Sequence, residues 1–478
     1  MWSAERQRTA VTSGAILLCT ALAALGVYWL TLAPGLTWAH HGIDGGELIT
    51  AVYTHGLPHP PGYPLYRLFS SWFARLPLGT IAYRFNLFSA LTTALAAGFV
   101  ALTSYQSRLL SLTDERTANG MGITAVATGL TFAFASLVWG QATITEVYGL
   151  ALLLLAAFLW ALLTQRPPWL IGLLLGLSIT AQLTAWFLLP LALALSPRRC
   201  WQALLGALLL GLLPLALLPW LASPDSPIVW GDPATPGGWW WVVSGQLYRG
   251  YAFALPQHEL PARLTAWLPV WFSQFTWAGI PLIVAGVALL AEGQRRTAYW
   301  LAGTAVLYLV FALTYLPDDA IVQTLPAWLL VSLLLGPAYQ RLSFLAPGLP
   351  LILLLINFSG QNLRADQQVR VRAEALLPAI PANAIVETPG DPTIFALWYF
   401  QHVEGQRPDV VLVDEHLFAF EWYRKRLAQQ NPALSGLNQP DVAVFQVLNE
   451  AKRPYCRASI NTHLDNLYTL TCSEETSS

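Results

Sequence analysis

Charged residues are scarce in this sequence. Of its 478 residues, 11% are charged and 55% are hydrophobic. A soluble domain carries roughly a quarter charged residues, so this chain lacks the polar surface that a globule in water needs. Its formal net charge of −1 also excludes the strongly basic surface by which proteins bind nucleic acid. We therefore expect a membrane protein with no nucleic-acid partner.

Cysteine and the common catalytic signatures are equally sparse. The chain has four cysteines, and none of them has the CxxC spacing of zinc and redox motifs. It has no HExxH or DxD metal motif, and no P-loop or GxSxG motif in a suitable context. We expect neither a metal nor a cofactor, which leaves the chemistry to ordinary side chains.

Long apolar runs dominate the first 358 residues. The first run, from Val11 to about Leu32, is longer than the apolar core of about 7–15 residues in a secretory signal, so we interpret it as a retained span. Runs long enough to cross about 30 Å of hydrocarbon then recur. The predicted spans are 11–32, 82–106, 120–138, 147–164, 200–222, 265–290, 298–315, 320–337 and 342–358.

The region 168–196 does not fit a single span, because Gln182 and Thr184 interrupt it in the middle. Two half-helices of about 14 residues would each be about 21 Å long, too short to cross alone. Broken helices of this kind are tolerated where they line a cavity inside the protein. We expect a re-entrant pair that returns to the side from which it started.

Arginine positions decide the orientation, because cytoplasmic loops carry an excess of basic residues. With a re-entrant 168–196 the arginines of these loops fall on one side, whereas a single crossing would invert every later loop. We expect a multi-pass protein of the inner or plasma membrane with a cytoplasmic N-terminus. The arginines assigned to the inside are Arg6, Arg8, Arg108, Arg116, Arg166, Arg198, Arg199, Arg295, Arg296 and Arg341.

The same orientation places four polar motifs together on the exported face. They are HHGIDGGE (40–47), WGQATITE (139–146), the loop 223–241 and LPDDA (316–320). The tail from about residue 359 onward is exported as well. We therefore divide the chain into a membrane module, 1–358, and an exported soluble domain, 359–478.

The tail has the composition of a small α/β domain. Its apolar runs at 384–387, 410–413 and 442–447 predict strands, and 393–403 and 417–428 predict helices. On the exported side, Cys456 and Cys472 either pair as a disulfide or remain free thiols. The predicted fold class is an α-helical polytopic membrane bundle, with about nine spans and one re-entrant pair, followed by the α/β domain.

Asp44 and Glu47 are the central candidates for chemistry. They form an acidic pair three residues apart in GIDGGELI, just after the first span, where they can meet the head of a lipid substrate. The glycines around them allow a sharp turn and a close approach to a ligand. As the structural alternative, Asp44 is only the N-cap of a helix through Leu48–Tyr53, worth about 1 kcal/mol.

The segment 55–77 follows the acidic pair. Four prolines stiffen its first half, and its second half has the spacing of an amphipathic helix that lies in the membrane interface. Either the segment is a structural collar, or it also holds His55, His59 and Arg67 over the acidic pair.

Further candidates have structural alternatives of their own. Glu146 binds substrate or caps the next helix, and Gln182 binds substrate or satisfies the broken backbone of the re-entrant pair. The planar fork of an arginine suits a phosphate. Arg249 is a candidate for that role, with Arg67 and Arg84 as competitors.

A last group of candidates lies in the exported loops. The tryptophans at 239–241 either stack on sugar rings or anchor the loop at the membrane interface. Asp318 and its neighbour Asp319 bind substrate or form a solvated turn. The other candidates for substrate contact are Gln141, Tyr148, Trp230, Asp232, Gln246 and Tyr248.

Several motifs, in this order, resemble one protein family. They are the acidic pair followed by HPPGYPL, then WGQATITEVYGL, VWGDPATPGGWWWVVSGQLYRG, QFTWAGI (274–280) and PGDPTIFALWYFQHVEGQRPDV (389–410). Together they resemble the bacterial family related to a eukaryotic transmembrane protein O-mannosyltransferase. The resemblance runs from about residue 30 to about 430. Gln182 departs from it, because that family usually has a histidine there.

The family belongs to the C-type (GT-C) glycosyltransferase superfamily, and the resemblance implies a function. It implies that the first exported loop carries the catalytic aspartate, which maps to Asp44, with Glu47 beside it in the acceptor pocket. Such enzymes move a sugar, here mannose or a similar hexose, from a polyprenyl-phosphate carrier in the membrane to an exported protein or glycan. The implied reaction inverts the sugar, and an arginine, first of all Arg249, stabilises the leaving phosphate.

Two other functions compete with this one. A transporter or flippase of a lipid-linked sugar would place its ionisable residues near the bilayer midplane, often in inverted repeats, whereas the polar motifs here collect at one face. A non-enzymatic receptor would use the tail as its sensor, so replacing the acidic loop residues by neutral ones would leave its function unchanged. The departure at Gln182 leaves the identity of the sugar open.

Overall fold

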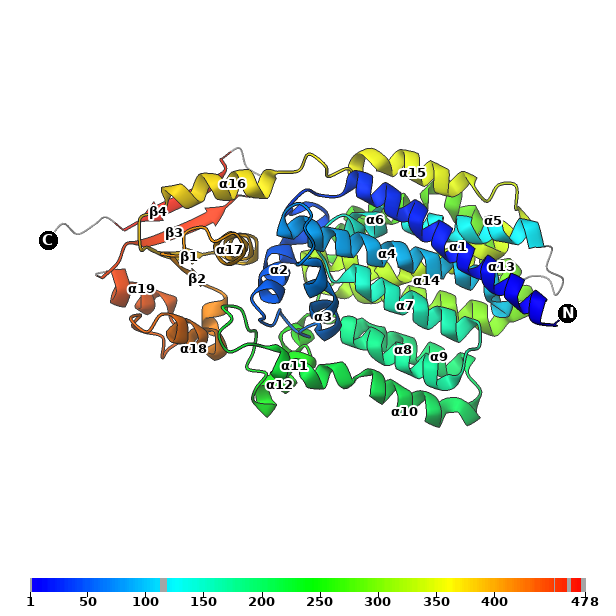
Figure 1. Cartoon of the computed structure of the whole chain (residues 1–478), viewed down its shortest axis with the longest axis horizontal. Coiled ribbons are helices and arrows are strands. Elements are labelled where there is room, and N and C mark those ends of the chain that lie inside the picture. Colours follow the sequence, from blue (N-terminus) through cyan, green and yellow to red (C-terminus); the bar gives the residue numbers. More distant parts are fainter. Residues whose placement is uncertain (1, 112–117, 451, 462–465, 474–478) are drawn as a thin grey trace.

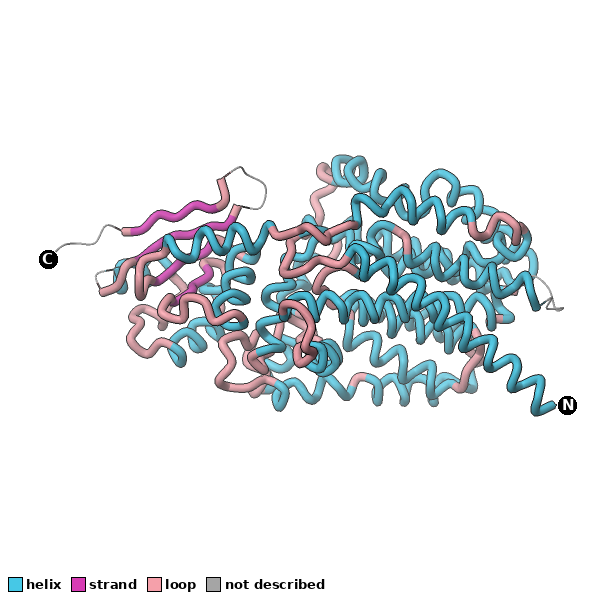
Figure 2. Tube along the Cα trace, turned by 45° about the horizontal axis from the view of Figure 1, so that its top comes forward, coloured by secondary structure: helices cyan, strands magenta, loops and turns pink. Residues whose placement is uncertain are grey.

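The computed structural model describes residues 2–111, 118–450, 452–461 and 466–473. The molecule is long, with a bundle of helices at one end and a small α/β domain at the other (Figure 1), and its two termini lie at opposite ends. The strands lie together in the α/β domain (Figure 2). The helical bundle followed by a small α/β domain confirms the predicted fold class, while the count of about nine spans stays a prediction. Arg116, one of the arginines assigned to a cytoplasmic loop, lies outside the described residues.

The bundle is built from helices rich in leucine and alanine. Small residues let these helices approach closely; a Cβ on Gly98 would come within 2.8 Å of the Leu17 carbonyl oxygen. Within the described residues, five helices are long and apolar enough to cross a membrane: Val11–Thr31, Ile81–Gln106, Arg198–Leu221, Leu260–Thr314 and Asp318–Arg341. The elements of the bundle are α1 (Trp2–Thr31), α4 (Ile81–Gln106), η2 (Arg108–Leu110), α5 (Ala118–Ala133), α6 (Ser136–Ala142), α7 (Tyr148–Leu163), α8 (Pro168–Ala181), η3 (Leu183–Leu188), α9 (Leu189–Leu195), η4 (Arg198–Cys200), α10 (Trp201–Gly211), α13 (Leu260–Thr314), α14 (Leu325–Arg341) and α15 (Gly348–Gln361).

Two of the predicted spans form the arms of α13. The element is interrupted at Gln294, whose φ of −134° and ψ of 51° are not helical. The Leu255 amide donates to the Thr314 carbonyl at 3.1 Å, so the residues just before the first arm lie beside the end of the second. The chain therefore doubles back near Gln294, as two separate spans require.

The span predicted over 120–138 is a bent pair of helices that are apolar enough together to cross a membrane. α5 and α6 meet at an angle of 71°, because Ala135 between them is extended. Polar side chains satisfy the backbone groups that this break frees, as a membrane interior requires. Asn357 donates to the Phe134 carbonyl at 2.9 Å, and Gln274 accepts from the Leu137 amide at 3.1 Å.

The chain doubles back within 168–196, as a re-entrant pair requires. α8 ends at Ala181, and η3 and α9 follow after Gln182. Gly172 of α8 faces Leu204 of α10, and Gly176 faces Leu208, so the residue numbers rise together and the two helices run parallel. The chain between them must return to the side where α8 begins. This return keeps the two arginines before α10 on that same side.

Short helices cover one end of the bundle. The predicted amphipathic helix is α3, which exposes Leu68 and Trp72 by 46% and 60% while it buries Arg67 and Ser70. Such an outward apolar face suits a membrane interface. The elements at this end are η1 (Ala39–Asp44), α2 (Gly45–Tyr53), α3 (Pro64–Phe73), η5 (Leu213–Leu217), α11 (Leu218–Leu221), α12 (Pro236–Val243), η6 (Gln246–Tyr251) and η7 (Asp318–Thr324).

The C-terminal domain is a four-stranded sheet in the order β2-β1-β3-β4. β1 is parallel to both of its neighbours, and β4 is antiparallel to β3. Cys456 of β3 lies opposite Cys472 of β4, and the two form a disulfide. The elements are α16 (Gln368–Leu376), η8 (Leu377–Ala379), β1 (Ile385–Thr388), α17 (Asp391–Trp398), η9 (Tyr399–Val403), β2 (Val411–Asp414), η10 (Leu417–Ala419), α18 (Glu421–Gln430), α19 (Val442–Glu450), β3 (Tyr455–Ile460) and β4 (Tyr468–Cys472).

The strand predicted over 442–447 is wrong, because this segment is helix α19. The Asp441 carboxylate accepts from the amides of Ala443 and Val444 at 2.9 and 3.2 Å, which starts a helix. Phe445 and Asn449, four residues apart, then form the buried face. The run of valines therefore forms part of an amphipathic helix and does not alternate across a sheet.

The α/β domain shares a hydrophobic core with the first loop of the bundle. Leu48 and Ile49 of α2 belong to the same buried cluster as Phe395 and Trp398 of α17. The expected division after residue 358 falls inside α15, which continues to Gln361. The division into two domains stays a prediction, while the shared core shows that the domain is seated on the loop that carries Asp44.

Candidate active site

Asp44 stands at the junction of η1 and α2. It occupies the N-cap position of α2, but its side chain makes no capping hydrogen bond. The helix therefore does not use the carboxylate, and the alternative of a simple N-cap loses its main support. About a third of the Asp44 side chain is exposed, 36%, so the carboxylate can meet a substrate.

Glu47 is buried in the first turn of α2 and organises the loop that follows. Its Oε1 accepts from the His59 amide at 2.9 Å, and its Oε2 lies 3.1 Å from His59 Nδ1. On the other side of the ring, His59 Nε2 lies 3.2 Å from the Tyr63 hydroxyl and 3.9 Å from Asp44 Oδ2. His59 thus joins the two carboxylates that the sequence pairs.

The charges of this cluster set its protonation. Burial opposes the charge on His59, but the negative charges of Glu47 and Asp44 outweigh it and raise the pKa of His59 to about 9. Burial raises the pKa of Asp44 to about 6, although the charge of His59 opposes the shift. At neutral pH the cluster therefore holds a protonated histidine and an ionised Asp44 whose pKa suits a general base.

Aromatic side chains from the large exported loop surround His59. The rings of Trp230 and Tyr248 lie edge-on to it, with centroids at 6.1 and 6.3 Å. A short bridge between Leu57 and Val229 joins this loop to the first one, and the Leu57 amide donates to the Ile228 carbonyl at 2.9 Å. This pairing is what brings residues about 170 apart in sequence into one site.

Glu146 and a chain of amides lie near the cluster. Burial, and then the negative charge of Asp44, raise the pKa of Glu146, while its Oε2 accepts from the Val147 amide at 3.2 Å. Gln182 donates to Gln323 at 2.8 Å, and Gln323 donates to the Tyr148 hydroxyl at 3.3 Å. Gln182 therefore connects the tip of the re-entrant pair to the start of α7.

The three candidate arginines differ in what holds them. Arg84 donates to the carbonyls of Ala74 and Leu78 at 2.6 and 2.8 Å, so its guanidinium is already occupied. Arg249 is exposed and lies over the Trp240 ring at 5.7 Å. Arg67 is 7% exposed, and its guanidinium has no hydrogen-bond or ion-pair partner among the described residues.

The other candidates do not join the cluster. Each has a different place: His55 serves through its backbone, whose carbonyl accepts from the Ser223 amide at 2.8 Å, and Gln141 donates to the His40 carbonyl at 2.6 Å. Asp232 and Gln246 are exposed. Asp318 is exposed too, 3.7 Å from Arg263.

Three residues near the cluster were not among the sequence candidates or were given less weight. Tyr63 bonds to His59, and its signal was its place within HPPGYPL. Asp319, rather than Asp318, carries the charge that acts on Asp44. Asp391 of α17 is exposed to solvent, although the surrounding protein removes part of its hydration. This loss of hydration is the larger cause, and the negative charge of Asp44 the next, of a pKa raised to about 7. A glycine-aspartate pair after a predicted strand was its only signal.

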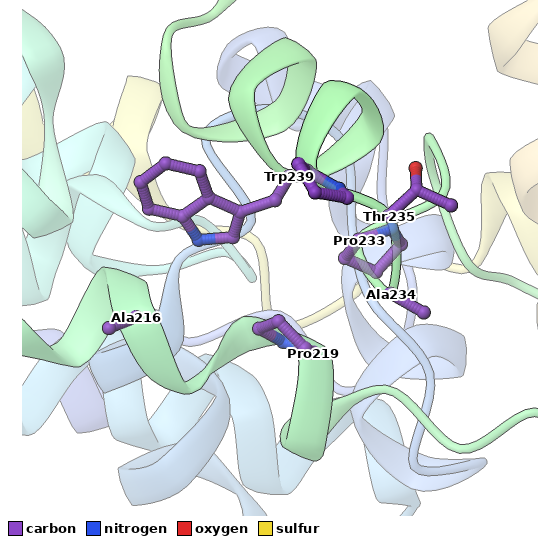
Figure 3. A pocket seen from close by; sticks show the side chains of 7 residues that line it. Ala216, Pro219, Pro233, Ala234, Thr235 and Trp239 are labelled. Carbon is purple, nitrogen blue, oxygen red and sulfur yellow. The ribbon is translucent and has the colours of Figure 1, made fainter.

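No metal cluster marks the site in the described part of the chain. Within the described residues, no group of three or more histidine, cysteine, aspartate or glutamate side chains could hold a metal ion. A pocket of about 280 Å³ lies elsewhere, under the Trp239 ring (Figure 3). Its lining residues are Ala216, Pro219, Pro233, Ala234, Thr235, Pro236 and Trp239. These residues carry no ionisable side chain, so the pocket contributes no acid–base chemistry.

Comparison with known proteins finds two family domains in the chain. A domain described as "Protein O-mannosyl-transferase TMEM260 N-terminal domain" matches residues 44–204, and "TMEM260-associated domain 2" matches residues 369–438. The protein O-mannosyl-transferase TMEM260 of Mus musculus is 26% identical over 89% of this chain and 66% of its own length. The chain thus spans slightly less than two thirds of that relative. The corresponding protein of Dictyostelium discoideum is 33% identical over 16% of this chain and 10% of its own length.

Two solved structures share the fold. ArnT from Cupriavidus metallidurans bound to undecaprenyl phosphate has a TM-score of 0.56 at 13% identity, covering 93% of this chain and 92% of that one. The same protein in the apo state has a TM-score of 0.53 at 13% identity, covering 94% and 93%. The likeness extends over nearly the whole of both chains, so the helical bundle and the C-terminal domain share one arrangement with ArnT.

Proposed function

Because this chain is a GT-C-fold membrane protein related to the protein O-mannosyl-transferase TMEM260 family, we propose that it is a glycosyltransferase. It moves a hexose, mannose or a close relative, from a polyprenyl-phosphate carrier to a hydroxyl group of an exported protein. The observation that carries the proposal is the partly exposed Asp44 carboxylate, which makes no capping bond to its helix and lies 3.9 Å from a histidine held by Glu47. Two relatives support the choice of substrates: one is named a protein O-mannosyl-transferase, and the solved ArnT structure holds undecaprenyl phosphate.

The mechanism assigns a task to each member of the cluster. Asp44 accepts the proton of the acceptor hydroxyl as its oxygen attacks the anomeric carbon. A new carbon–oxygen bond forms on one face of the sugar while the bond to the carrier phosphate breaks on the other, which inverts the anomeric centre. A positioned base of this kind contributes typically 10²–10⁴-fold. Glu47 positions His59, and His59 positions Asp44.

Arg67 is the best candidate for the leaving phosphate. Burying an unpaired guanidinium is unfavourable unless an anion completes the site, and Arg67 has no such partner among the described residues. Burial lowers the pKa of Arg67 to about 10, which leaves it charged at neutral pH. Its backbone amide donates to the carbonyl of Tyr63, the residue just before α3, at 3.0 Å. This replaces Arg249, which the resemblance put first.

The proposed orientation follows from the arginines and the disulfide. The loops with the basic pairs face the cytoplasm, and the end that carries Asp44 faces outward. The disulfide between Cys456 and Cys472 fits an exported C-terminal domain, since disulfides persist in oxidising compartments. The substrates would then meet at the exported surface of the inner or plasma membrane.

An experiment on purified protein separates transfer from transport. Detergent-solubilised protein is incubated with labelled polyprenyl-phosphate hexoses and a synthetic peptide rich in serine and threonine, with a free oligosaccharide as a second acceptor. A glycosyltransferase consumes the carrier and labels an acceptor. A flippase leaves every carrier molecule intact, and that result would refute the proposal. A receptor would likewise leave the carrier unchanged.

A further inference from the structure

The C-terminal domain reaches the catalytic loop through one close helix contact. α17 lies against α2 (Figure 1), where a Cβ on Gly46 would come within 2.3 Å of the Phe395 carbonyl oxygen. No other residue type fits between the two backbones without a shift. The contact therefore fixes the start of α17 relative to Asp44 and Glu47, which flank Gly46 in the sequence.

The end of the sheet that faces this contact is the carboxyl end of its parallel strands. β1 ends at Thr388 and β2 at Asp414, and the turn that follows β1 leads into α17 at Asp391. Ligands of parallel α/β sheets bind outside the carboxyl ends of the strands. The fold of the domain thus presents its usual ligand-binding edge to the site that holds Asp44.

Two aspartates lie at this edge, and they differ in how they are used. Asp414 is satisfied inside the domain, since it accepts from the Thr388 hydroxyl and from the amides of His416 and Leu417, each at 3.0 Å. Asp391 is exposed, and its carboxylate has no hydrogen-bond or ion-pair partner in the described part of the chain. Asp414 therefore stabilises the domain itself, whereas the Asp391 carboxylate is available to a ligand.

The packing of α17 on α2 brings Asp391 within electrostatic reach of the catalytic loop. The negative charges of Asp44 and Glu47 both help to raise the pKa of Asp391, and the charge of His59 opposes them. Carboxylates that act on one another in this way repel an anion such as the carrier phosphate, and they favour a ligand rich in hydrogen-bond donors. A polypeptide segment with hydroxyl and amide donors has that chemistry.

We propose that Asp391 binds the acceptor, a hydroxyl-bearing polypeptide segment held between the C-terminal domain and the catalytic loop. The inference rests on the proposed glycosyltransferase function and gives the C-terminal domain a part in it. The carrier approaches from the membrane side, where Arg67 lies, and the acceptor enters under α17. Asp391 accepts a hydrogen bond from the segment and aligns its hydroxyl with Asp44.

The test separates acceptor binding from donor chemistry. The full-length protein is assayed with polyprenyl-phosphate mannose and a synthetic peptide rich in serine and threonine, and hydrolysis of the donor is measured without peptide. Asp391→Ala is expected to raise the peptide KM about 10- to 100-fold, as expected when a hydrogen bond to a charged group is lost. Donor hydrolysis stays within about twofold. The matched control is Glu374→Gln, an exposed carboxylate on α16 of the same domain.

Each outcome has one meaning. Wild-type protein that labels the peptide, together with an Asp391→Ala variant of unchanged peptide KM, overturns this inference and leaves the glycosyltransferase intact. Wild-type protein that consumes no donor overturns both. Labelling of the oligosaccharide alone also overturns the peptide assignment. If the alanine variant unfolds at a lower temperature than wild type, the isosteric Asp391→Asn is measured in its place, with the same expected direction.

Discussion

At the scale of single residues, the local motif predicts the acidic pair but not its partners. Asp44 and Glu47 stand three apart in a glycine-rich loop after a span, which is visible in the sequence. His59 was a candidate because it lies in the proline-rich segment that follows the acidic pair. Asp391 reaches Asp44 only because the chain returns after more than 300 residues to place α17 on α2. No local pattern encodes such a contact.

The pH dependence of the reaction follows from two of these residues. kcat/KM is expected to rise with pH through about 6, as Asp44 loses its proton, and to fall above about 9, as His59 loses its charge. In Glu47→Gln the partner that raises the pKa of His59 is gone, so the upper limb moves to lower pH. Initial rates across a pH series measure both limbs. An upper limb that does not move in a folded Glu47→Gln variant would contradict the role of the pair.

The same linkage makes a prediction about stability. His59 has a folded pKa of about 9 against an ordinary value of 6.5, so its ion pair stabilises the fold fully below pH 6.5 and loses this effect as the pH rises through 9. Removing one partner of a buried pair costs about 3–5 kcal/mol. Thermal unfolding of Glu47→Gln is therefore expected at a lower Tm than wild type, with the difference shrinking at high pH. A difference that grows with pH has the wrong sign.

Arg67 is predicted to lower the stability of the fold and to be needed for binding of the carrier. Arg67→Met is expected to raise Tm, because it removes a buried guanidinium that lacks a partner, and to weaken carrier binding by about 1.5–3 kcal/mol, the loss of a charged hydrogen bond. Arg249→Met, the control, changes an exposed side chain and leaves the KM for carrier near wild type. Titration with polyprenyl phosphate measures the affinity. The reverse ranking of the two arginines would refute the assignment.

At the scale of elements, hydropathy predicts the long helices well, but it predicts bends in helices and the type of short segments less well. The long apolar helices and the first two strands are found where the sequence predicts them. The bend between α5 and α6 is missed, because Asn357 and Gln274, which satisfy the broken backbone there, come from distant parts of the chain. β3 and β4 were not predicted, and α19 was mistaken for a strand. Short valine-rich segments do not distinguish a helix from a strand until their buried face is known.

The contact between α2 and α17 makes a prediction about two adjacent glycines. Gly46→Ala places a Cβ 2.3 Å from a backbone oxygen, whereas in Gly45→Ala the nearest atoms lie at 3.3 Å. Overpacking of this kind costs about 1–3 kcal/mol, while alanine in a helix otherwise stabilises by about 1 kcal/mol relative to glycine. Gly46→Ala is expected to lower Tm and peptide transfer, and Gly45→Ala to preserve both. Equal behaviour of the two variants would show that α17 does not sit as described.

At the scale of the whole molecule, the arginines predict an arrangement that the packing supports. The parallel course of α8 and α10 requires a return of the chain between them, which is the re-entrant pair that the charge distribution demanded. What the sequence could not supply is the seat of the C-terminal domain. Its contact surface consists of ordinary buried apolar residues such as Ile49 and Phe395, which look like any other core.

The orientation can be tested with the thiols of the chain. Cys200 is unpaired and follows the arginine pair before α10, while Cys456 and Cys472 are bonded to each other. In intact cells a membrane-impermeant maleimide is expected to label Glu374→Cys on the C-terminal domain and to spare Cys200. Opening the cells makes Cys200 reactive, and Cys200→Ser removes that signal. Labelling of Cys200 in intact cells would invert the topology.

The central claim is that Asp44 is the base of a hexosyl transfer at this site. Its most direct test measures the labelled hexose that purified Asp44→Asn moves from polyprenyl-phosphate hexose to the peptide at neutral pH. Asp225→Asn, which changes an exposed aspartate of the large loop, serves as the matched control. The expected result is a 10²–10⁴-fold loss of turnover in Asp44→Asn, with unchanged carrier affinity and a Tm no lower than that of wild type, and wild-type turnover in the control. Wild-type turnover in folded Asp44→Asn would contradict the claim.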